Sequence, residues 1–216
     1  GCGKSTTLRM IAGLEDITSG SLHMRGQVVN NVACGDRGVS MVFQNYALFP
    51  HMTVKNNIIY GLKAHKMEAA EINRRLEEVL EMLQLKGLED RKPKDLSGGQ
   101  RQRVGIARAL AVNPDFIVCD EPISALDVSI QAQVINLLDD LRHKMGLTIL
   151  FIAHDLSVVK YFSDRIGVMY YGKMVELADS DELFKHPLHP YTKSLLSAIP
   201  LPDPHYEKQR QRISYV

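Results

Sequence analysis

Apolar residues recur along the chain in two patterns, one typical of buried strands and one of amphipathic helices. Short continuous apolar runs at 39–43, 116–119 and 148–153 have the length expected of strands buried on both faces. Apolar positions three and four residues apart indicate helices instead. The helices that this spacing predicts cover residues 68–85, 128–144 and 156–162. Strands that alternate with helices are typical of a mostly parallel sheet, so the pattern predicts an α/β fold.

Turn residues add shorter elements to this outline. Residues 1–13 predict a glycine-rich turn that opens a short helix, and residues 21–31 have the alternation of short strands. Residues 166–177 predict a hairpin around Tyr171-Gly172, and residues 191–198 predict one more helix.

The stretch from about residue 45 to residue 112 is mostly helical and interrupts the alternation of strands and helices. It includes a predicted helix at 101–111. We therefore expect a helical subdomain at 45–112, inserted into an α/β core made of 1–44 and 113–185. A short polar, proline-rich tail covers 186–216.

Composition and charge exclude several classes of protein. With 45% hydrophobic and 24% charged residues, the chain is an ordinary globular one. Twenty-six basic against 25 acidic residues leave a net charge of +1, which argues against a dedicated nucleic-acid binder. Cys2, Cys34 and Cys119 are far apart and fit neither a disulfide framework nor a metal-ligand spacing. A reducing cytosol is the simplest setting for such cysteines.

The first six residues, GCGKST, match the second half of the phosphate-binding pattern G-x-x-x-x-G-K-[ST]. Glycines let backbone N–H groups approach phosphate oxygens, and the following helix presents its positive end to the same anion. Lys4 would reach the β- and γ-phosphates, Ser5 would bind Mg²⁺, and Thr6 would support the α-phosphate side. The candidate phosphate-binding residues are Gly1, Cys2, Gly3, Lys4, Ser5 and Thr6. The alternative is a glycine turn that carries a lysine by chance.

Two carboxylates follow the apolar run at 116–119. They would lie at the carboxyl edge of a parallel sheet, where such folds bind ligands. Asp120 would hold Mg²⁺ through water, and Glu121 would act as general base on the attacking water. Taken alone, the pair could equally be an acidic helix cap.

Four further segments complete a set of motifs. They are Gln44 after the first strand, LSGGQ at 96–100, SALD at 124–127 and His154 after the third strand. Together with the phosphate loop and the 120–121 carboxylates, they occur in the order found in the nucleotide-binding subunits of ATP-binding cassette (ABC) transporters. The chain resembles that family over essentially its whole length, which implies a P-loop NTPase core.

The resemblance implies roles for these segments. Ser97, Gly98, Gly99 and Gln100 of one subunit would close on ATP held by the phosphate loop of another, with Asp127 near the seam of the dimer. Gln44 would reach Mg²⁺ or the water and link the core to the helical subdomain. His154 would contact the γ-phosphate as a neutral imidazole.

Each of these segments also has a structural alternative. The segment at 97–99 opens a helix, so it would be a second anion-binding N-terminus. The structural alternative is an N-cap with a flexible hinge. Asp127 has the position of an ordinary N-cap, and His154 that of a polar residue at a strand end.

The resemblance implies an ATP-binding and ATP-hydrolysing subunit of a bacterial ABC importer, peripheral on the cytoplasmic face of the cell membrane. Its cofactors would be ATP and Mg²⁺. Its partners would be membrane permease subunits, a second ATPase subunit, identical or not, and indirectly a solute-binding protein. No cysteine follows Cys119, so we expect no iron–sulfur cluster.

Two parts of the chain resemble importers of different solutes. Residues 1–95, above all QNYALFPHMTV at 44–54, resemble sugar-importer ATPases. Residues from 112 onward resemble oligopeptide and dipeptide importers, notably at 120–129, 189–196 and 199–204. We predict a peptide importer, with a sugar or sugar-phosphate importer as the alternative.

Two other classes remain open. A DNA-repair or chromosome-organising ABC ATPase would need a long coiled coil, and no heptad run of that length exists here. The chain begins without methionine inside the phosphate-binding pattern. It is therefore expected to be N-terminally truncated and to lack a β-rich segment, an adenine-stacking aromatic residue and a strand, and it could be a weakly active or inactive fragment.

Overall fold

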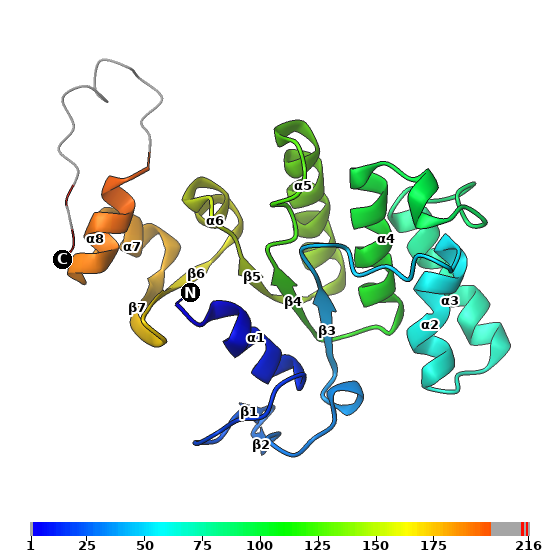
Figure 1. The fold of residues 1–216 in the computed structure, drawn as a ribbon, viewed down its shortest axis with the longest axis horizontal. Helices are drawn as coiled ribbons and strands as arrows, with labels where there is room; N and C mark the ends of the chain where they lie inside the picture. Colours follow the sequence, from blue (N-terminus) through cyan, green and yellow to red (C-terminus); the bar gives the residue numbers. More distant parts are fainter. Residues whose placement is uncertain (1, 200–212, 214, 216) are drawn as a thin grey trace. The chain divides into compact units, whose positions relative to one another are not determined.

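The computed structural model describes residues 2–199, 213 and 215. The predicted site residue Gly1 and the tail segment 200–204 lie outside the described residues. The chain forms two compact units (Figure 1). One unit is Leu8–Ile152, and the other combines the start of the chain through Thr7 with the residues from Ala153 on. The domain boundaries expected from the sequence stay a prediction.

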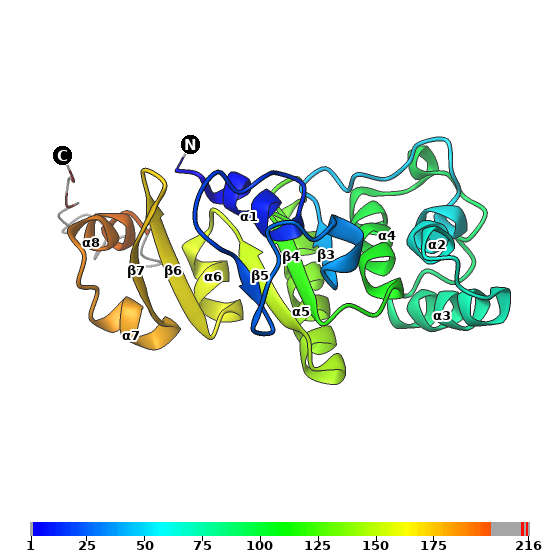
Figure 2. The ribbon, with the colours of Figure 1, turned by 90° about the horizontal axis from the view of Figure 1, so that it is seen from below.

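The first unit contains a three-stranded parallel sheet. Its strands are β3 (Val39–Val42), β4 (Phe116–Asp120) and β5 (Thr148–Ile152), in the order β3-β4-β5. All three were predicted, and the parallel pairing confirms the α/β fold. The central strand β4 is the most deeply buried, which explains why its side chains are apolar up to Cys119. Helix α5 (Val128–Met145) lies along one face of the sheet (Figure 2).

Three longer helices and a one-turn helix make up the segment between β3 and β4. They are α2 (Val54–Ala64), α3 (Ala69–Met82), η2 (Pro93–Asp95) and α4 (Gly98–Ala111). Their inner faces bury Ile58, Leu62, Leu80 and Ile106 almost completely. The predicted helical stretch is thus confirmed, and α4 begins three residues earlier than the apolar pattern indicated, because Ser97 caps it.

Helix α1 (Lys4–Ala12) starts the chain's regular structure, as predicted. The short hairpin of β1 (His23–Met24) and β2 (Gln27–Val28) and the one-turn helix η1 (Cys34–Asp36) follow it. Arg37 fastens the end of α1: its guanidinium donates to the carbonyls of Met10 at 2.7 Å and Ile11 at 3.1 Å. These are carbonyls of the last helical turn, which have no partner within the helix.

The second unit is built on a β-hairpin covered by helices. Its elements in chain order are α6 (Leu156–Phe162), β6 (Arg165–Tyr170), β7 (Lys173–Asp179), α7 (Ser180–Lys185) and α8 (Pro190–Ser197). The hairpin turns at Tyr171-Gly172, as predicted. Ile166, Val168 and Leu183 form its core, against which α8 packs (Figure 2). Helix α7 lies in a stretch for which the sequence predicted no element.

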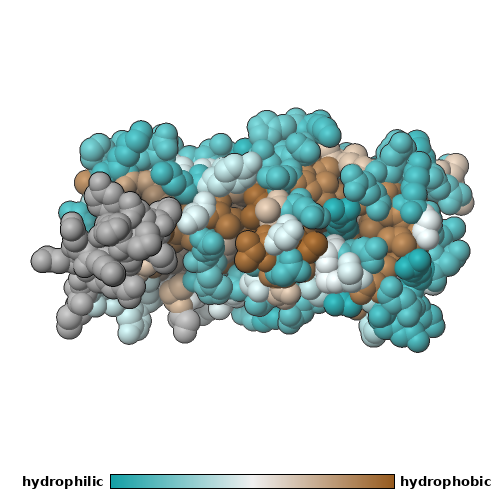
Figure 3. Space-filling model, turned by 90° about the horizontal axis from the view of Figure 1, so that it is seen from above, coloured by the Kyte–Doolittle hydropathy of each residue, from teal (hydrophilic) through white to brown (hydrophobic). Residues whose placement is uncertain are grey.

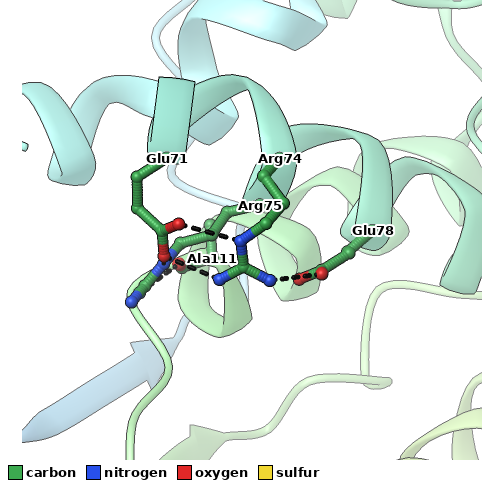
Figure 4. Close-up of polar contacts among 5 residues, drawn as sticks. All are labelled: Glu71, Arg74, Arg75, Glu78 and Ala111. Carbon is green, nitrogen blue, oxygen red and sulfur yellow. Dashed lines mark hydrogen bonds and ion pairs between the residues drawn. The ribbon is translucent and has the colours of Figure 1, made fainter. Parts of the chain in front are cut away.

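A network of ion pairs lies along α3, and one of its arginines bonds to the end of α4 (Figure 4). Glu71 accepts hydrogen bonds from Arg74 and from Arg75, and Arg74 also pairs with Glu78. Arg75 in turn donates to the carbonyl of Ala111, the last residue of α4, at 3.2 Å. The hydrogen bonds from Arg74 and Arg75 hold the pKa of Glu71 at about 2, well below its ordinary value.

Among the described residues, no helix is long and apolar enough to cross a membrane. The face drawn in Figure 3 is mostly hydrophilic, with smaller hydrophobic areas between the polar side chains.

Candidate functional site

The phosphate loop, described here as residues 2–6, belongs to the second unit and leads into the first turn of α1. Gly3 is the residue before the helix and has a φ of +87°, a conformation that favours glycine. The carbonyl of Gly3 accepts from the Thr7 backbone N–H at 3.0 Å and from the Thr7 hydroxyl at 2.9 Å. Because glycine has no side chain, no residue at this position caps the first amides of α1, and they face the place where a bound anion is expected.

Lys4 contacts Cys2 within this loop. The Lys4 ammonium donates to the Cys2 sulfur at 3.1 Å, and both side chains are half-buried. This hydrogen bond and the charge of Lys4 hold the pKa of the Cys2 thiol below its ordinary value. Ser5 and Thr6, the other predicted phosphate and Mg²⁺ contacts, are exposed in the first helical turn.

The carboxyl edge of the sheet brings together two of the predicted catalytic residues and a predicted metal ligand. Gln44 follows the end of β3 by two residues, Asp120 ends β4, and Glu121 comes directly after it. Val42 pairs with Cys119 and Asp120 pairs with Ile152, so these strand ends are level with one another. The placement expected from the sequence is therefore confirmed for Gln44, Asp120 and Glu121.

Glu121 adopts an unusual backbone conformation. Its φ is +49°, which is uncommon for a residue with a side chain. The Glu121 N–H donates to the carbonyl of Ile152, the last residue of β5, at 3.1 Å. The Glu121 carbonyl accepts from the backbone N–H and the hydroxyl of Ser124. Backbone bonds on both sides thus fix the position from which the half-buried Glu121 side chain projects.

His154 follows the end of β5 by two residues and is exposed. It belongs, with Lys4 and Ser5, to the second unit. Its predicted contact with a γ-phosphate stays a prediction.

Asp127 caps helix α5. Its carboxylate accepts a hydrogen bond from the Ile130 backbone N–H at 3.0 Å. The interpretation of Asp127 as an N-cap is confirmed, whereas its place near a dimer seam stays a prediction.

The signature segment 97–100 forms a complete capping box at the start of α4. The Ser97 hydroxyl accepts from the Gln100 N–H at 3.2 Å, and the Gln100 side chain accepts from the Ser97 N–H at 2.9 Å. Ser97 and Gln100 therefore have structural roles in this chain, and their contact with ATP stays a prediction.

Packing requires one of the two glycines of the signature segment, Gly99. A Cβ added to Gly99 would lie 2.8 Å from the Cγ2 atom of Ile130 in the first turn of α5. A Cβ on Gly98 would lie 3.4 Å from Leu126 and from the Tyr46 hydroxyl. The signature segment thus lies against the turn that ends in Asp127, an adjacency that the sequence did not predict.

The segment after Gln44 contains residues that the sequence analysis missed. Tyr46 and Ala47 have φ values of 60° and 45°, and their carbonyls accept from Arg108 at 3.2 and 2.6 Å. The Arg101 guanidinium lies 5.4 Å from the centre of the Tyr46 ring. Arg101 and Arg108 are seven residues apart, so their shared face on a predicted helix was the available signal.

No group of three or more histidine, cysteine or acidic side chains gathers within the described part of the chain. The predicted Mg²⁺ ligands Ser5, Gln44 and Asp120 therefore stay a prediction. Cys34 is exposed, and burial raises the pKa of Cys119 to about 12.

Comparison with known families finds two matches. Residues 1–124 match the family model described as ABC transporter. Residues 175–215 match the model described as oligopeptide/dipeptide transporter, C-terminal region.

Similar proteins cover the chain from end to end. The oligopeptide transport ATP-binding protein OppF of Bacillus subtilis is 56% identical over 100% of this chain and 74% of its own length. The dipeptide transport ATP-binding protein DppF of Lactococcus lactis is 51% identical over 100% of this chain and 73% of its own. A solved structure, described as the dimeric post-hydrolysis state of the ATP-binding cassette MJ0796 bound to ADP and Pi, superimposes with a TM-score of 0.73. It is 33% identical and covers 83% of this chain and 81% of that one.

Proposed function

Because the chain belongs to the ABC transporter family and is an ATPase of that family, we propose that it drives the import of oligopeptides or dipeptides. The observation that carries the choice of solute is the match of residues 175–215 to the C-terminal region of peptide transporters. The high identity to OppF and DppF over the whole chain supports the same solute class. The sugar-importer resemblance of residues 44–54 is the competing indication.

The phosphate loop binds the ATP phosphates in this proposal. The amides at the start of α1 and the Lys4 ammonium donate to the β- and γ-phosphate oxygens. The proposed Mg²⁺ ligands, Ser5, Gln44 and Asp120, supply a hydroxyl, an amide oxygen and a carboxylate, a donor set that suits a hard cation. Bound Mg²⁺ neutralises charge on the phosphates. The position of Asp120 at the carboxyl end of β4 supports its part in this set.

Glu121 accepts a proton from the attacking water in this proposal. Its backbone is fixed by the bond to Ile152 and by the Ser124 turn, so the point from which its side chain projects is set before the substrate arrives. His154 donates one hydrogen bond to the γ-phosphate. Gln44 orients the water from the end of the neighbouring strand.

A second ATPase subunit completes the site. The amides of Gly98 and Gly99, which the capping box does not use, donate to ATP bound at the phosphate loop of the partner. The dimeric state of the similar solved structure supports this arrangement. Asp127, in the turn packed against these glycines, lies at the seam.

Membrane permease subunits are the other proposed partners, and the chain is peripheral on the cytoplasmic face of the membrane. The helices α2 to α4 and the segment after Gln44 contact those subunits. A solute-binding protein delivers the peptide to the permease and acts on this chain indirectly.

Uptake by cells tests the solute class. In Bacillus subtilis lacking its OppF, the protein is expected to restore uptake of a labelled tripeptide, and the Glu121→Gln variant is expected not to. The same assay in cells lacking a sugar-importer ATPase tests the competing solute. Rescue of sugar uptake without rescue of peptide uptake would overturn the proposal.

A further inference from the structure

The turn of the β6–β7 hairpin touches the backbone of the phosphate loop. The Gly172 N–H donates to the carbonyl of Cys2 at 3.1 Å. A Cβ added to Gly3 would lie 3.5 Å from the Cα of Gly172, so a side chain at position 3 would touch the turn. All of these residues belong to the second unit.

This bond determines which way a peptide group of the loop faces. In a trans peptide, the carbonyl oxygen of one residue and the N–H of the next point in opposite directions. The chain has no cis peptide bonds among its described residues. A Cys2 carbonyl bound by Gly172 therefore directs the Gly3 N–H away from the hairpin. Thr7 orients the next peptide in the same way, because it binds the Gly3 carbonyl and so fixes the direction of the Lys4 N–H.

The hairpin turn is itself held by rings of the C-terminal region. Tyr170, the last residue of β6, lies 4.4 Å from Tyr191 of α8 and 5.2 Å from Tyr215, measured between ring centroids. Tyr191 and Tyr215 also contact each other, at 5.6 Å. We call Tyr170, Tyr191 and Tyr215 the tyrosine cluster. Ring pairs at such distances are mutually attractive, so the cluster restrains the residue next to the turn.

Polar bonds anchor the C-terminal side of the tyrosine cluster. The Glu176 carboxylate of β7 accepts from the Leu188 N–H at 2.8 Å and from the His189 N–H at 3.1 Å, just before α8 begins. The Ser194 hydroxyl donates to the Ile213 carbonyl, and the Ile213 N–H donates to the Ser197 hydroxyl. Ile213 is thereby fixed to α8, which brings Tyr215 to the cluster.

We infer that Tyr191 is a positioning residue for ATP binding: through Tyr170 and the Gly172 turn, it fixes the Cys2–Gly3 peptide so that the Gly3 N–H faces the phosphates. The C-terminal region that matches peptide transporters thus helps to shape the phosphate loop. This inference rests on the proposed binding of ATP by that loop. It extends the proposal by giving residues 175–215 a task in nucleotide binding.

The test compares Tyr191→Ala with Tyr191→Phe, which keeps the ring, and with Leu188→Ala. Leu188 belongs to the same segment, but its side chain is exposed. Losing the ring contacts is expected to raise the KM for ATP about threefold to tenfold, the factor that corresponds to an aromatic pair. We expect kcat to change less than about twofold, because the reacting groups stay in place. Tyr191→Phe and Leu188→Ala are expected to match the wild type.

A second readout reports on the loop without ATP. In a Cys34→Ser background, where Cys119 is buried, alkylation of Cys2 by a maleimide measures the order of the loop. Tyr191→Ala is expected to alkylate at least about twofold faster than the wild type if its ring contacts restrain the loop. Tyr215→Ala is expected to change both readouts in the same direction by less, and it covers the case in which Tyr191→Ala does not fold.

The outcomes separate this inference from the proposal on which it rests. Unchanged KM and unchanged alkylation in Tyr191→Ala, or in Tyr215→Ala if the former does not fold, would overturn the inference. A lower kcat at unchanged KM would also overturn it. If Lys4→Ala binds ATP as well as the wild type does, the proposed role of the phosphate loop fails, whatever Tyr191 does.

Discussion

The N-terminal ends of α1 and α4 carry the two motifs that we propose bind phosphates, yet the two ends are capped differently. At α1, the residue before the helix is Gly3. The Cys2 carbonyl of its loop accepts a hydrogen bond from Gly172, and the Gly3 carbonyl accepts from Thr7. At α4, Ser97 and Gln100 use their own side chains to cap the helix. The first end thus has a glycine in the place of a capping side chain, whereas the second is closed by a capping box.

This difference indicates separate roles for the two helix ends in binding ATP. A glycine before a helix leaves room for an anion beside the start of the helix, so α1 is suited to hold the phosphates of ATP. A capped end is stable by itself and has fewer amides to offer. The end of α4 is therefore suited to add contacts to an ATP molecule already bound elsewhere, which agrees with its proposed role across a dimer.

The largest expected effect is on the affinity for ATP, and it differs between variants at the two helix ends. Lys4→Ala removes the ammonium group from the phosphate loop, and we expect the Kd for ATP to rise at least about 100-fold. Ser97→Ala, at the other helix end, is expected to leave the Kd of the single subunit within about twofold if that end adds its contacts only across the dimer. Titration with a fluorescent ATP analogue measures both. Equal losses in the two variants would contradict the comparison.

The packing of α4 against α5 gives the next effect. Gly99→Ala places a Cβ 2.8 Å from Ile130, and overpacking of this kind is expected to lower the free energy of unfolding by about 1–3 kcal/mol. Gly98→Ala is the matched control, because its Cβ would meet its neighbours at 3.4 Å, an ordinary contact distance. Urea unfolding measures both variants. Recovery of stability in Gly99→Ala combined with Ile130→Ala would assign the loss to that contact.

The capping box at α4 accounts for a smaller effect. Ser97→Ala removes the hydroxyl that accepts from Gln100, and we expect a loss of about 1 kcal/mol in unfolding free energy. Ser97→Asn keeps an acceptor at the cap and is expected to lose less than half as much. An unchanged denaturation midpoint in Ser97→Ala would show that the box contributes nothing to stability.

Acid has the smallest expected effect, and it distinguishes two carboxylates whose pKa values are lowered in the folded chain. Partial burial raises the pKa of Glu176, but bonds from the Leu188 and His189 amides outweigh it and leave the pKa below the ordinary value of 4.5. Its contribution to stability is therefore complete above 4.5 and is lost as the pH falls through the lowered value. Glu71, which pairs with Arg74 and Arg75 within α3, has a pKa of about 2 and keeps its pairs to lower pH.

Melting temperatures across an acid series check this order. The difference between wild type and Glu176→Gln should disappear at a higher pH than the difference between wild type and Glu71→Gln. Disappearance in the opposite order would contradict the assignment.

Local elements were predictable from the sequence, because they depend on neighbours along the chain. The runs at 39–43 and 148–153 and the turn at Tyr171-Gly172 correspond to observed strands and a hairpin. The order of Gln44, Asp120 and Glu121 at the carboxyl edge followed from parallel strands alone. The bounds differ by a few residues where a cap, such as Ser97, sets the end.

Contacts between distant segments were not predictable from one sequence. Nothing in the spacing of residues indicates that Gly172 binds the Cys2 carbonyl or that Gly99 lies against Ile130. The left-handed backbone of Glu121 was missed for a similar reason, since the bond to Ile152 that fixes it comes from another strand. Helix α7 was missed because its 6 residues are too few to show a helical spacing of apolar positions.

Whether this chain is an ATPase with Glu121 as its general base is tested by measuring ATP binding and ATP turnover side by side in the wild type and in Glu121→Gln. The amide keeps the size and shape of the side chain but accepts no proton. We expect Glu121→Gln to have a Kd for ATP within about twofold of the wild type and a kcat lowered about 100-fold or more. Equal turnover in the two proteins would contradict it.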